Sequence, residues 1–285
     1  MSTAQSYLRS LTLALAVLSL AGSGFSPRAR EAWARHQPHH VSSFSLPEAP
    51  QDPGAPTGRR EGGSSRGDKM FTLCKTLAEV SKNKCATSRL TALVPETSTR
   101  KLIWGFTAAD YPEFVFYLSK FRQPNQPKTT QLPIEFVLQD ENDHYVYKTK
   151  FVLPLTEGGF IRIPVPNSSE PLQEGKRYTW TLLTRFSPNE TNYVHGRIYR
   201  TALSSKLRQQ LQTATASQRL DLYLKEGLWF DALSMLVGLK QKAPQDLQLA
   251  SQWSALLQDI RLAELAKEPI LPCCSGEQQV SLAGN

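Results

Sequence analysis

The 285-residue sequence lacks the motifs that usually identify an enzyme or a nucleic-acid-binding protein. It contains no GxSxG nucleophile elbow, HExxH zinc motif, Walker loop or GxGxxG dinucleotide fingerprint. Only five histidines and four cysteines are present. The net charge of +8 is not gathered into an extended lysine and arginine tract. These absences argue against a cofactor, a metal site and a nucleic-acid partner, although an enzyme of another design stays open.

Long apolar runs are also lacking. The run LTLALAVLSL, Leu11 to Leu20, has about half of the roughly twenty residues that a transmembrane helix needs. Arg9 precedes it and the small residues Ala21 to Gly24 follow it, the order typical of a secretory signal. We therefore expect a signal peptide over residues 1–23, and an exported, periplasmic or extracellular chain without a transmembrane segment. An uncleaved N-terminal anchor is the alternative.

Residues 24–68 are rich in proline, and GRREGGSSRGD closes the stretch. Such a segment buries too little apolar surface to offset its ordering entropy, so a disordered linker is predicted there. Beyond it, Phe71 and Leu73 begin a pattern that allows a short helix ending near Asn83. Cys74 and Cys85 are candidates for a disulfide in an exported protein. The bond requires the chain to double back, and free thiols are the alternative.

Between residues 101 and 201 the pattern changes to short runs rich in β-branched and aromatic residues, separated by turn formers. The runs are LIWGFTA, EFVFYLSK, PIEFVLQD, YVYKTKFVL, FIRIPV, RYTWTLLTRF and YVHGRIYR. In one of them Tyr178, Trp180, Leu182 and Thr184 alternate with Thr179, Thr181, Leu183 and Arg185. Seven short strands without an intervening helix predict an antiparallel, immunoglobulin-like β-sandwich over residues 69–202.

After Thr201 the apolar period becomes helical, and a helical bundle is predicted over residues 203–271, followed by a flexible tail over 272–285. Part of it resembles one tetratricopeptide-like helical hairpin. The residues that carry this resemblance, and the apolar anchor beside them, are Tyr223, Gly227, Trp229, Ala232 and Pro244. Stacked repeats normally number three or more, so a single unit must bury its apolar face elsewhere.

The segment from Leu228 to Leu236 is the most apolar part of this hairpin. We expect Trp229 and Phe230 to dock on the sandwich and complete its core. A groove for a partner is the alternative interpretation.

Arginines and tyrosines gather on the last two predicted strands. They are Arg177, Arg185, Arg197 and Arg200, with Tyr193 and Tyr199 nearby. If these residues share a face, it could bind an acidic glycan, lipid head groups or an acidic protein. An ordinary solvated strand face is the alternative.

Several stretches occur in one order along the chain: LTALVPE (Leu90 to Glu96), GFTAADYPEFVFYL (Gly105 to Leu118), IEFVLQDENDHYVYKTKFVLP (Ile134 to Pro154), GKRYTW (Gly175 to Trp180), HGRIYR (His195 to Arg200) and EGLWFDAL (Glu226 to Leu233). Together, over about residues 85–271, the chain resembles the cyanobacterial domain of unknown function nine-two-eight. The resemblance implies an exported protein with a β-rich part followed by helices, and it implies no activity, cofactor or catalytic residue.

The resemblance also bears on the cysteines. Members of the family usually carry a second cysteine in the strand near Phe186, a partner for the position of Cys85. Phenylalanine stands there in this chain. The resemblance therefore implies that this bridge is missing and that Cys85 is either free or paired with Cys74.

Three hypotheses for function follow. The first is a non-catalytic interaction or assembly module that binds an unknown protein or another component of the periplasm or cell envelope. The second is an envelope hydrolase acting on a glycan or an ester, which a cleft with His195 and converging carboxylates would favour. The third is a binder of an anionic ligand through the arginine strands, with salt-sensitive binding as its mark.

Overall fold

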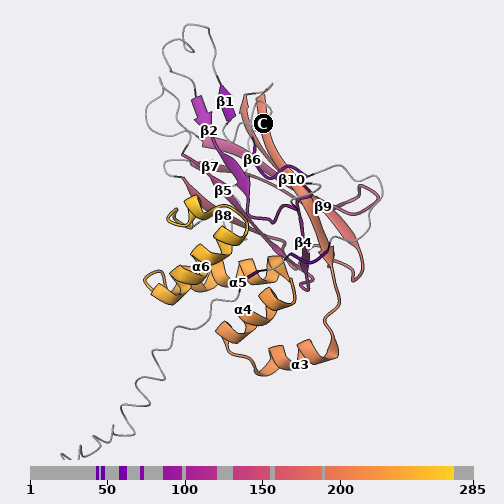
Figure 1. The fold of residues 1–285 in the computed structure, drawn as a ribbon. Coiled ribbons are helices and arrows are strands. Elements are labelled where there is room, and N and C mark those ends of the chain that lie inside the picture. The colour runs from indigo at the N-terminus through magenta and orange to yellow at the C-terminus, as the bar shows by residue number, and fades with distance from the viewer. Residues whose placement is uncertain are drawn as a thin grey trace, which may run out of the picture. The chain divides into compact units, whose positions relative to one another are not determined.

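The computed structural model describes residues 43–44, 46–48, 58–62, 71–73, 86–97, 101–120, 131–154, 158–187 and 190–272. All of them belong to one compact unit, Val41–Asn285. Within them the chain forms strands first and helices afterwards, which confirms the predicted class of a β-rich part followed by an α-helical part (Figure 1).

The larger sheet has five strands in the order β4-β10-β9-β6-β7. Their bounds are β4 (Trp104–Thr107), β6 (Gln131–Gln139), β7 (Tyr145–Pro154), β9 (Arg177–Ser187) and β10 (Glu190–Arg200). Three of the four pairings are antiparallel, but β4 runs parallel to β10, with Trp104 beside Arg197. The prediction of a purely antiparallel fold is therefore wrong at this edge, because β4 and β10 are joined by a long crossover and not by a hairpin.

The smaller sheet is antiparallel and has the order β3-β5-β8, with β3 (Leu90–Ala92), β5 (Glu113–Leu118) and β8 (Gly159–Pro164). A separate pair joins β1 (Phe71–Leu73) to β2 (Ala86–Ser88). The helix predicted to begin at Phe71 is wrong for residues 71–73, since these residues pair as a strand. Cys74 and Cys85 lie outside the described residues, as do residues 1–23 and the tail beyond residue 272.

Strand alternation builds the core between the two sheets. Tyr178, Trp180, Leu182 and Thr184 are buried, as the period-two pattern predicts. Their face of the larger sheet meets the smaller sheet through ring contacts. The centroids of Phe114 and Phe136 lie 4.9 Å apart, and those of Phe116 and Trp180 lie 5.7 Å apart. The two sheets thus share one aromatic core.

Four α-helices follow: α3 (Ser205–Thr213), α4 (Ala216–Lys225), α5 (Trp229–Lys242) and α6 (Leu247–Asp259), with a 3-10 turn, η1 (Ala263–Leu265). Helices α3 and α4 are separate although only Ala214 and Thr215 lie between them. The structure divides them because the Thr215 side chain caps the amide of Gln218, while the Gln218 side chain accepts from the Thr215 amide. This reciprocal capping box starts a new helix.

Helix α5 packs against the sheets, with β4 and β5 as its neighbours (Figure 1). The Phe230 ring lies 5.2 Å from the Phe114 ring, and the Trp229 indole N–H donates to the carbonyl of Leu93 at 2.8 Å. Both side chains are buried. A Cβ on Gly105 of β4 would lie 3.1 Å from Trp229, so this glycine permits the close approach. The most apolar part of the hairpin is therefore a packing element.

Residues 58–62 fall in the segment predicted to be a linker, and the structure instead pairs them with both sheets. Arg59 forms an antiparallel bridge with His195 of β10, and Glu61 forms one with Thr91 of β3. A Cβ on Gly62 would lie 2.1 Å from the side-chain oxygen of Asn192, so only glycine fits this approach. The linker prediction is therefore wrong for residues 58–62, because local composition does not record a sheet edge that lies within reach.

None of the helices in the described part of the chain is both long enough and apolar enough to cross a membrane.

Candidate functional site

The outer face of the five-stranded sheet carries most of the predicted binding residues. The register places Tyr199 opposite Arg177, and Arg197 opposite Thr179. Alternation then puts five of the six residues on one face, away from the aromatic core: Arg177, Arg185, Tyr193, Arg197 and Tyr199. We call the side of the larger sheet that bears these residues the outer face.

Arg200 does not lie on the outer face. It is adjacent to Tyr199 and so points to the opposite side, where its side chain is only 8% exposed. Its guanidinium binds the carboxylate of Asp110 at 2.8 Å and lies 3.7 Å from that of Glu174. The prediction that Arg200 contributes to a basic surface is therefore wrong. Side chains alternate between the two faces of a strand, and Arg200 is three residues from Arg197, so the two arginines lie on opposite faces.

The outer face gains two lysines from β7 that sequence reasoning missed. Lys150 lies opposite Glu135 of β6 in the register. The Glu135 carboxylate is 3.0 Å from the ammonium of Lys148, 3.6 Å from that of Lys150 and 3.6 Å from the guanidinium of Arg185. We call these four residues the Glu135 cluster. Three cations share one carboxylate, so the cluster has a net charge of +2.

In the Glu135 cluster the carboxylate is ionised but covered, and the cations are exposed. Desolvation on its own would raise the pKa of Glu135, but the hydrogen bond and charge of Lys148 and the charges of Lys150 and Arg185 outweigh it and lower the pKa. The carboxylate is only 13% exposed, while Lys148, Lys150 and Arg185 are 40%, 58% and 50% exposed. The anion is thus covered and the cations face the solvent.

A second basic group lies along β10. The Arg59 guanidinium is 4.9 Å from the centre of the Tyr193 ring, and this ring is 5.9 Å from that of His195. Desolvation, together with the charges of Arg59 and Arg197, lowers the pKa of His195. The groups recorded around this imidazole are cations and an aromatic ring, which is not the setting of a general base supported by a carboxylate.

Next to these residues, Trp104 and Phe106 of β4 form an aromatic cluster with Tyr199. The ring centroids of Trp104 lie 5.1 Å from those of Phe106 and 5.7 Å from those of Tyr199. Tyr199 is thereby held as part of a packed edge rather than as a separate contact residue.

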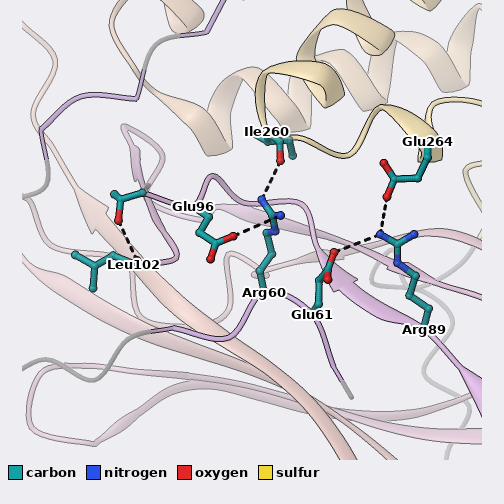
Figure 2. A network of polar contacts seen from close by, with 8 residues as sticks. Arg60, Glu61, Arg89, Glu96, Leu102, Ile260 and Glu264 are labelled. Carbon is teal, nitrogen blue, oxygen red and sulfur yellow. Dashed lines mark hydrogen bonds and ion pairs between the residues drawn. The ribbon is translucent and has the colours of Figure 1, made fainter. Parts of the chain in front are cut away.

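A polar network ties residues 58–62 to the helical part of the chain (Figure 2). Arg60 donates to the carbonyl of Ile260 at 2.8 Å and pairs with Glu96 at 3.5 Å. Arg89 pairs with Glu61 at 3.3 Å and with Glu264 at 2.7 Å. The network joins the edge of β3 to the end of α6 and to η1. Each arginine of the network is paired with at least one carboxylate, which is typical of a structural tie.

A cavity of about 320 Å³ lies beside this network. Lys101 and Arg261 line it, and both have positive backbone φ angles, 50° and 60°. Glu96 and Asp259 line it as well, and the Asp259 carboxylate accepts from the amide of Phe44 at 2.7 Å. The Phe44 ring in turn lies 4.7 Å from that of Trp229. The cavity thus carries both signs of charge and belongs to the junction where the residues before the sheets meet the helices.

The residues of the predicted hairpin lie on α4 and α5, in the turn between them and just after the end of α5. Gly227 has a φ of +71°, in the left-handed region that glycine adopts readily, and a Cβ there would lie 2.3 Å from Pro47. Ala232 is fully buried, Tyr223 is partly buried, and Pro244 is exposed two residues after α5 ends.

One partly buried titratable group, where α5 meets the end of β4, was not predicted. Asp231, in the first turn of α5, accepts from the amide of Ala108 at 2.9 Å and from the Thr107 hydroxyl. Desolvation raises its pKa to about 6, although both hydrogen bonds and the charge of Arg200 oppose the rise. The sequence signal was an acid inside an apolar helix start, which burial converts into a group that titrates at mildly acid pH.

Comparison with known proteins gives one strong match and several weak ones. A sequence model described as Domain of Unknown Function (DUF928) matches residues 61–270. No curated protein matches.

Among solved structures, the chain is similar to the fn3 domain of human collagen alpha-1(XX), with 9% identity over 34% of this chain and 83% of that chain and a TM-score of 0.18. It is also similar to a glycosyl hydrolase family 2 member from Bacteroides cellulosilyticus, with 11% identity over 57% and 34% and a TM-score of 0.24. It is similar as well to a Parabacteroides merdae beta-glucuronidase, with 9% identity over 64% of this chain and 28% of that chain and a TM-score of 0.24. The chain therefore spans only a minor part of both hydrolases.

Proposed function

This chain belongs to the family described as Domain of Unknown Function (DUF928), and we propose that it is an exported, non-catalytic interaction module that binds an acidic protein through the outer face of its larger sheet. The observation that carries the proposal is the Glu135 cluster, in which three exposed cations surround one covered carboxylate.

The cluster is suited to attract a partner rather than to stabilise the fold. Exposed ion pairs contribute little to folding, about 0–1 kcal/mol each. Three cations on one carboxylate leave two positive charges uncompensated within the cluster. Exposed charges of one sign speed the encounter with an oppositely charged partner and orient it. Lys148 also lies 4.9 Å from the centre of the exposed Tyr145 ring, which adds an apolar contact beside the charge.

Binding is favoured over hydrolysis by the surroundings of His195. A histidine that acts as a general base needs a partner that stabilises its protonated form. Arg59 and Arg197 do the opposite, since their charges lower the pKa of His195. The hydrolase hypothesis also gains no support from the likeness to glycosyl hydrolases, because the TM-scores are 0.24.

Export is the second part of the proposal. It is supported by the sequence of residues 1–23, in which Arg9, an apolar run and small residues follow one another. The proposed site of action is the periplasm or the cell envelope. Recovery of the tagged chain from the cytoplasm with its first residues attached would contradict this part.

The finer architecture belongs to the proposal as well. The ring contacts between the two sheets support an immunoglobulin-like sandwich. The left-handed Gly227 between α4 and α5, with Ala232 buried next to it along α5, supports one tetratricopeptide-like hairpin within a C-terminal helical bundle. In this arrangement the helices complete the scaffold and leave the outer face to the partner.

The proposal is tested by neutralising the cluster. The variant Lys148→Gln, Lys150→Gln, Arg185→Gln removes its three cations, and Lys206→Gln, Arg208→Gln, Lys242→Gln removes three exposed cations of the helical part as a matched control. Binding to immobilised poly-L-glutamate is measured at low and high salt. We expect the cluster variant to lose about tenfold in affinity at low salt and the control about twofold or less.

Equal losses in the two variants, or binding that does not change with salt, would contradict the proposed face. Preference for an acidic polysaccharide or for vesicles of anionic lipid over poly-L-glutamate would replace the acidic protein by another class of partner.

A further inference from the structure

The outer edge of β7 offers a second recognition element beside the Glu135 cluster. We infer that an extended segment of an acidic partner pairs with β7 as an additional strand of the larger sheet. This inference rests on the proposed function and specifies the form of the partner. Strand addition of this kind obtains affinity from main-chain hydrogen bonds and specificity from alternate side chains.

Both edges of the smaller sheet are occupied by neighbouring segments of the same chain. At β3, Gly62 donates to Leu90 at 2.7 Å and Ala92 donates to Arg60 at 2.8 Å. At β8, Phe160 donates to Pro269 and Leu271 donates to Phe160, both at 2.8 Å. At the far edge of the larger sheet, β4 has only four residues, and Arg59 bridges β10 ahead of the start of β4.

In contrast, β7 has one pairing, with β6, and the described residues place no strand or bridge on its other side. It is a ten-residue strand, Tyr145–Pro154. A long edge strand presents a row of main-chain donors and acceptors that a partner strand can use.

Two prolines indicate which main-chain groups of β7 face outward. Pro133 lies opposite Val152 in the β6–β7 register, and it has no N–H to donate. Proline is tolerated where the ladder does not need a main-chain donor, so the main-chain N and C=O of residue 133 face away from β7. Alternation then directs the main-chain groups of Lys148, Lys150 and Val152 to the open edge. The main chain of Pro154, two residues after Val152, also faces the open edge, where the β6–β7 ladder needs no N–H donor.

The two faces of β7 define the side chains of the partner. Lys148 and Lys150 extend on the outer face, toward Glu135. Tyr147 and Phe151 are partly buried and pack on the core from the other face. A strand laid along this edge would place alternate residues beside the lysines and the rest beside the two rings. The fitting segment therefore alternates acidic residues with apolar or β-branched ones.

A second copy of this chain is a poorer occupant. Pairing of β7 with β7 of another copy would bring lysines of the two strands together on the outer face. Like charges in neighbouring cross-strand positions are destabilising. The lysines thus disfavour self-pairing while they favour an acidic strand.

Two peptides of equal composition test the inference on the unmodified protein. One alternates five glutamates with five threonines, and the other carries the five glutamates and five threonines as two blocks. Affinities are measured by fluorescence anisotropy with labelled peptides. If the partner adds a strand, the alternating peptide binds about fivefold or more tightly than the block peptide, because only alternation puts every carboxylate on one face. Equal affinities would overturn the inference.

Substitution of Val152 separates the inference from the proposed function. Val152→Pro removes an outward-facing donor without changing charge, and Val152→Thr keeps the donor as the matched control. We expect Val152→Pro, but not Val152→Thr, to weaken binding of the alternating peptide about tenfold or more. Circular dichroism and the melting temperature establish that both variants fold.

The two possible failures are distinct. If neutralising the Glu135 cluster weakens peptide binding while Val152→Pro binds as well as Val152→Thr, the outer face binds through side chains alone and the added strand is wrong. If neutralisation has no effect, the proposed function itself fails. Should Val152→Pro unfold, amide hydrogen exchange of the unmodified protein decides, since slowed exchange at residues 148, 150 and 152 on peptide binding is required. Dimerisation through β7 would also overturn the inference.

Discussion

Two carboxylates with opposite pKa shifts distinguish two regions of this protein. Glu135, on the outer face, has a lowered pKa because nearby cations outweigh its desolvation. Asp231, at the junction of α5 with β4, has a pKa raised to about 6 because desolvation outweighs its hydrogen bonds and the charge of Arg200. On the outer face, exposed cations favour the ionised carboxylate, whereas the packing between α5 and β4 disfavours it.

The contrast indicates how the work is divided within the chain. The interior between the sheets and α5 supplies stability through buried rings such as Trp180 and Trp229. The outer face contributes little stability and can therefore carry charges chosen for a partner. Four experiments, ordered by the largest effect that each is expected to show, test this division.

Trp229→Ala should cost about 3–5 kcal/mol of unfolding free energy, because it leaves a cavity at the junction and an unpaired carbonyl at Leu93. Urea denaturation measures the loss. Tyr145→Ala, which removes an exposed aromatic ring of β7, is the matched control, and its unfolding free energy should change by no more than about 0.5 kcal/mol. A loss below about 1 kcal/mol for Trp229→Ala would refute the docking of α5.

Asp231→Asn should stabilise the protein at neutral pH by up to about 3 kcal/mol, the free energy that corresponds to a pKa of about 6 against the ordinary 3.8. Since the pKa is raised in the folded protein, the stabilising effect of the bound proton is complete below about pH 4 and is lost as the pH rises through about 6. Thermal unfolding of both proteins across this range checks the sign. A gain from the substitution that stays constant with pH would argue against burial of the carboxyl.

Arg200→Met and Arg185→Met compare arginines on the two sides of one sheet. Arg200 is buried and paired with Asp110 and Glu174, so its replacement should cost about 2 kcal/mol. The replacement of Arg185, half exposed beside Glu135, should change stability by about 0.5 kcal/mol or less. Chemical denaturation of both variants measures the difference, and equal costs would contradict the assignment of opposite faces.

Glu135→Gln should cost less than Arg200→Met, a loss of about 1 kcal/mol or less at neutral pH. Because the pKa of Glu135 is lowered in the folded protein, its carboxylate stabilises the fold fully at a pH above the ordinary pKa of 4.5. This contribution is lost as the pH falls through the lowered pKa. The substitution should also tighten binding to poly-L-glutamate, because it removes the only acid of the cluster. Weaker binding would show that the partner needs Glu135 itself.

The sequence predicted the strands better than their pairing. All seven runs between residues 101 and 201 are strands, since β-branched and aromatic residues there alternate and turn formers separate them. The parallel contact of Trp104 with Arg197 was not predictable, because β4 and β10 are far apart in the chain and no local pattern encodes their direction. The break before Thr215 could have been found, since Thr215 and Gln218 have capping-box spacing.

The candidate site was partly predictable. Alternation places Arg177 and Arg185 on one face of β9 and separates Arg197 from Arg200 on β10. The β9–β10 register is then needed to show that Arg197, and not Arg200, shares the face of the β9 arginines. The lysines of β7 depend on a hairpin register that places Lys150 beside Glu135. That register follows from the turn at residues 140–144, whose geometry Asp140 fixes by accepting from the amides of Asn142 and His144.

The contacts of residues 43–62 set a limit on how this polypeptide can be trimmed. Phe44 lies against Trp229, Pro47 fills the space beside Gly227, and Arg59 pairs with β10. A protease that cut between residues 48 and 58 would separate Phe44 and Pro47 from the chain that follows, and their hold on the helices would then depend on weak contacts alone. Maturation that preserves the junction must therefore cleave ahead of Ser43, as removal of residues 1–23 would do.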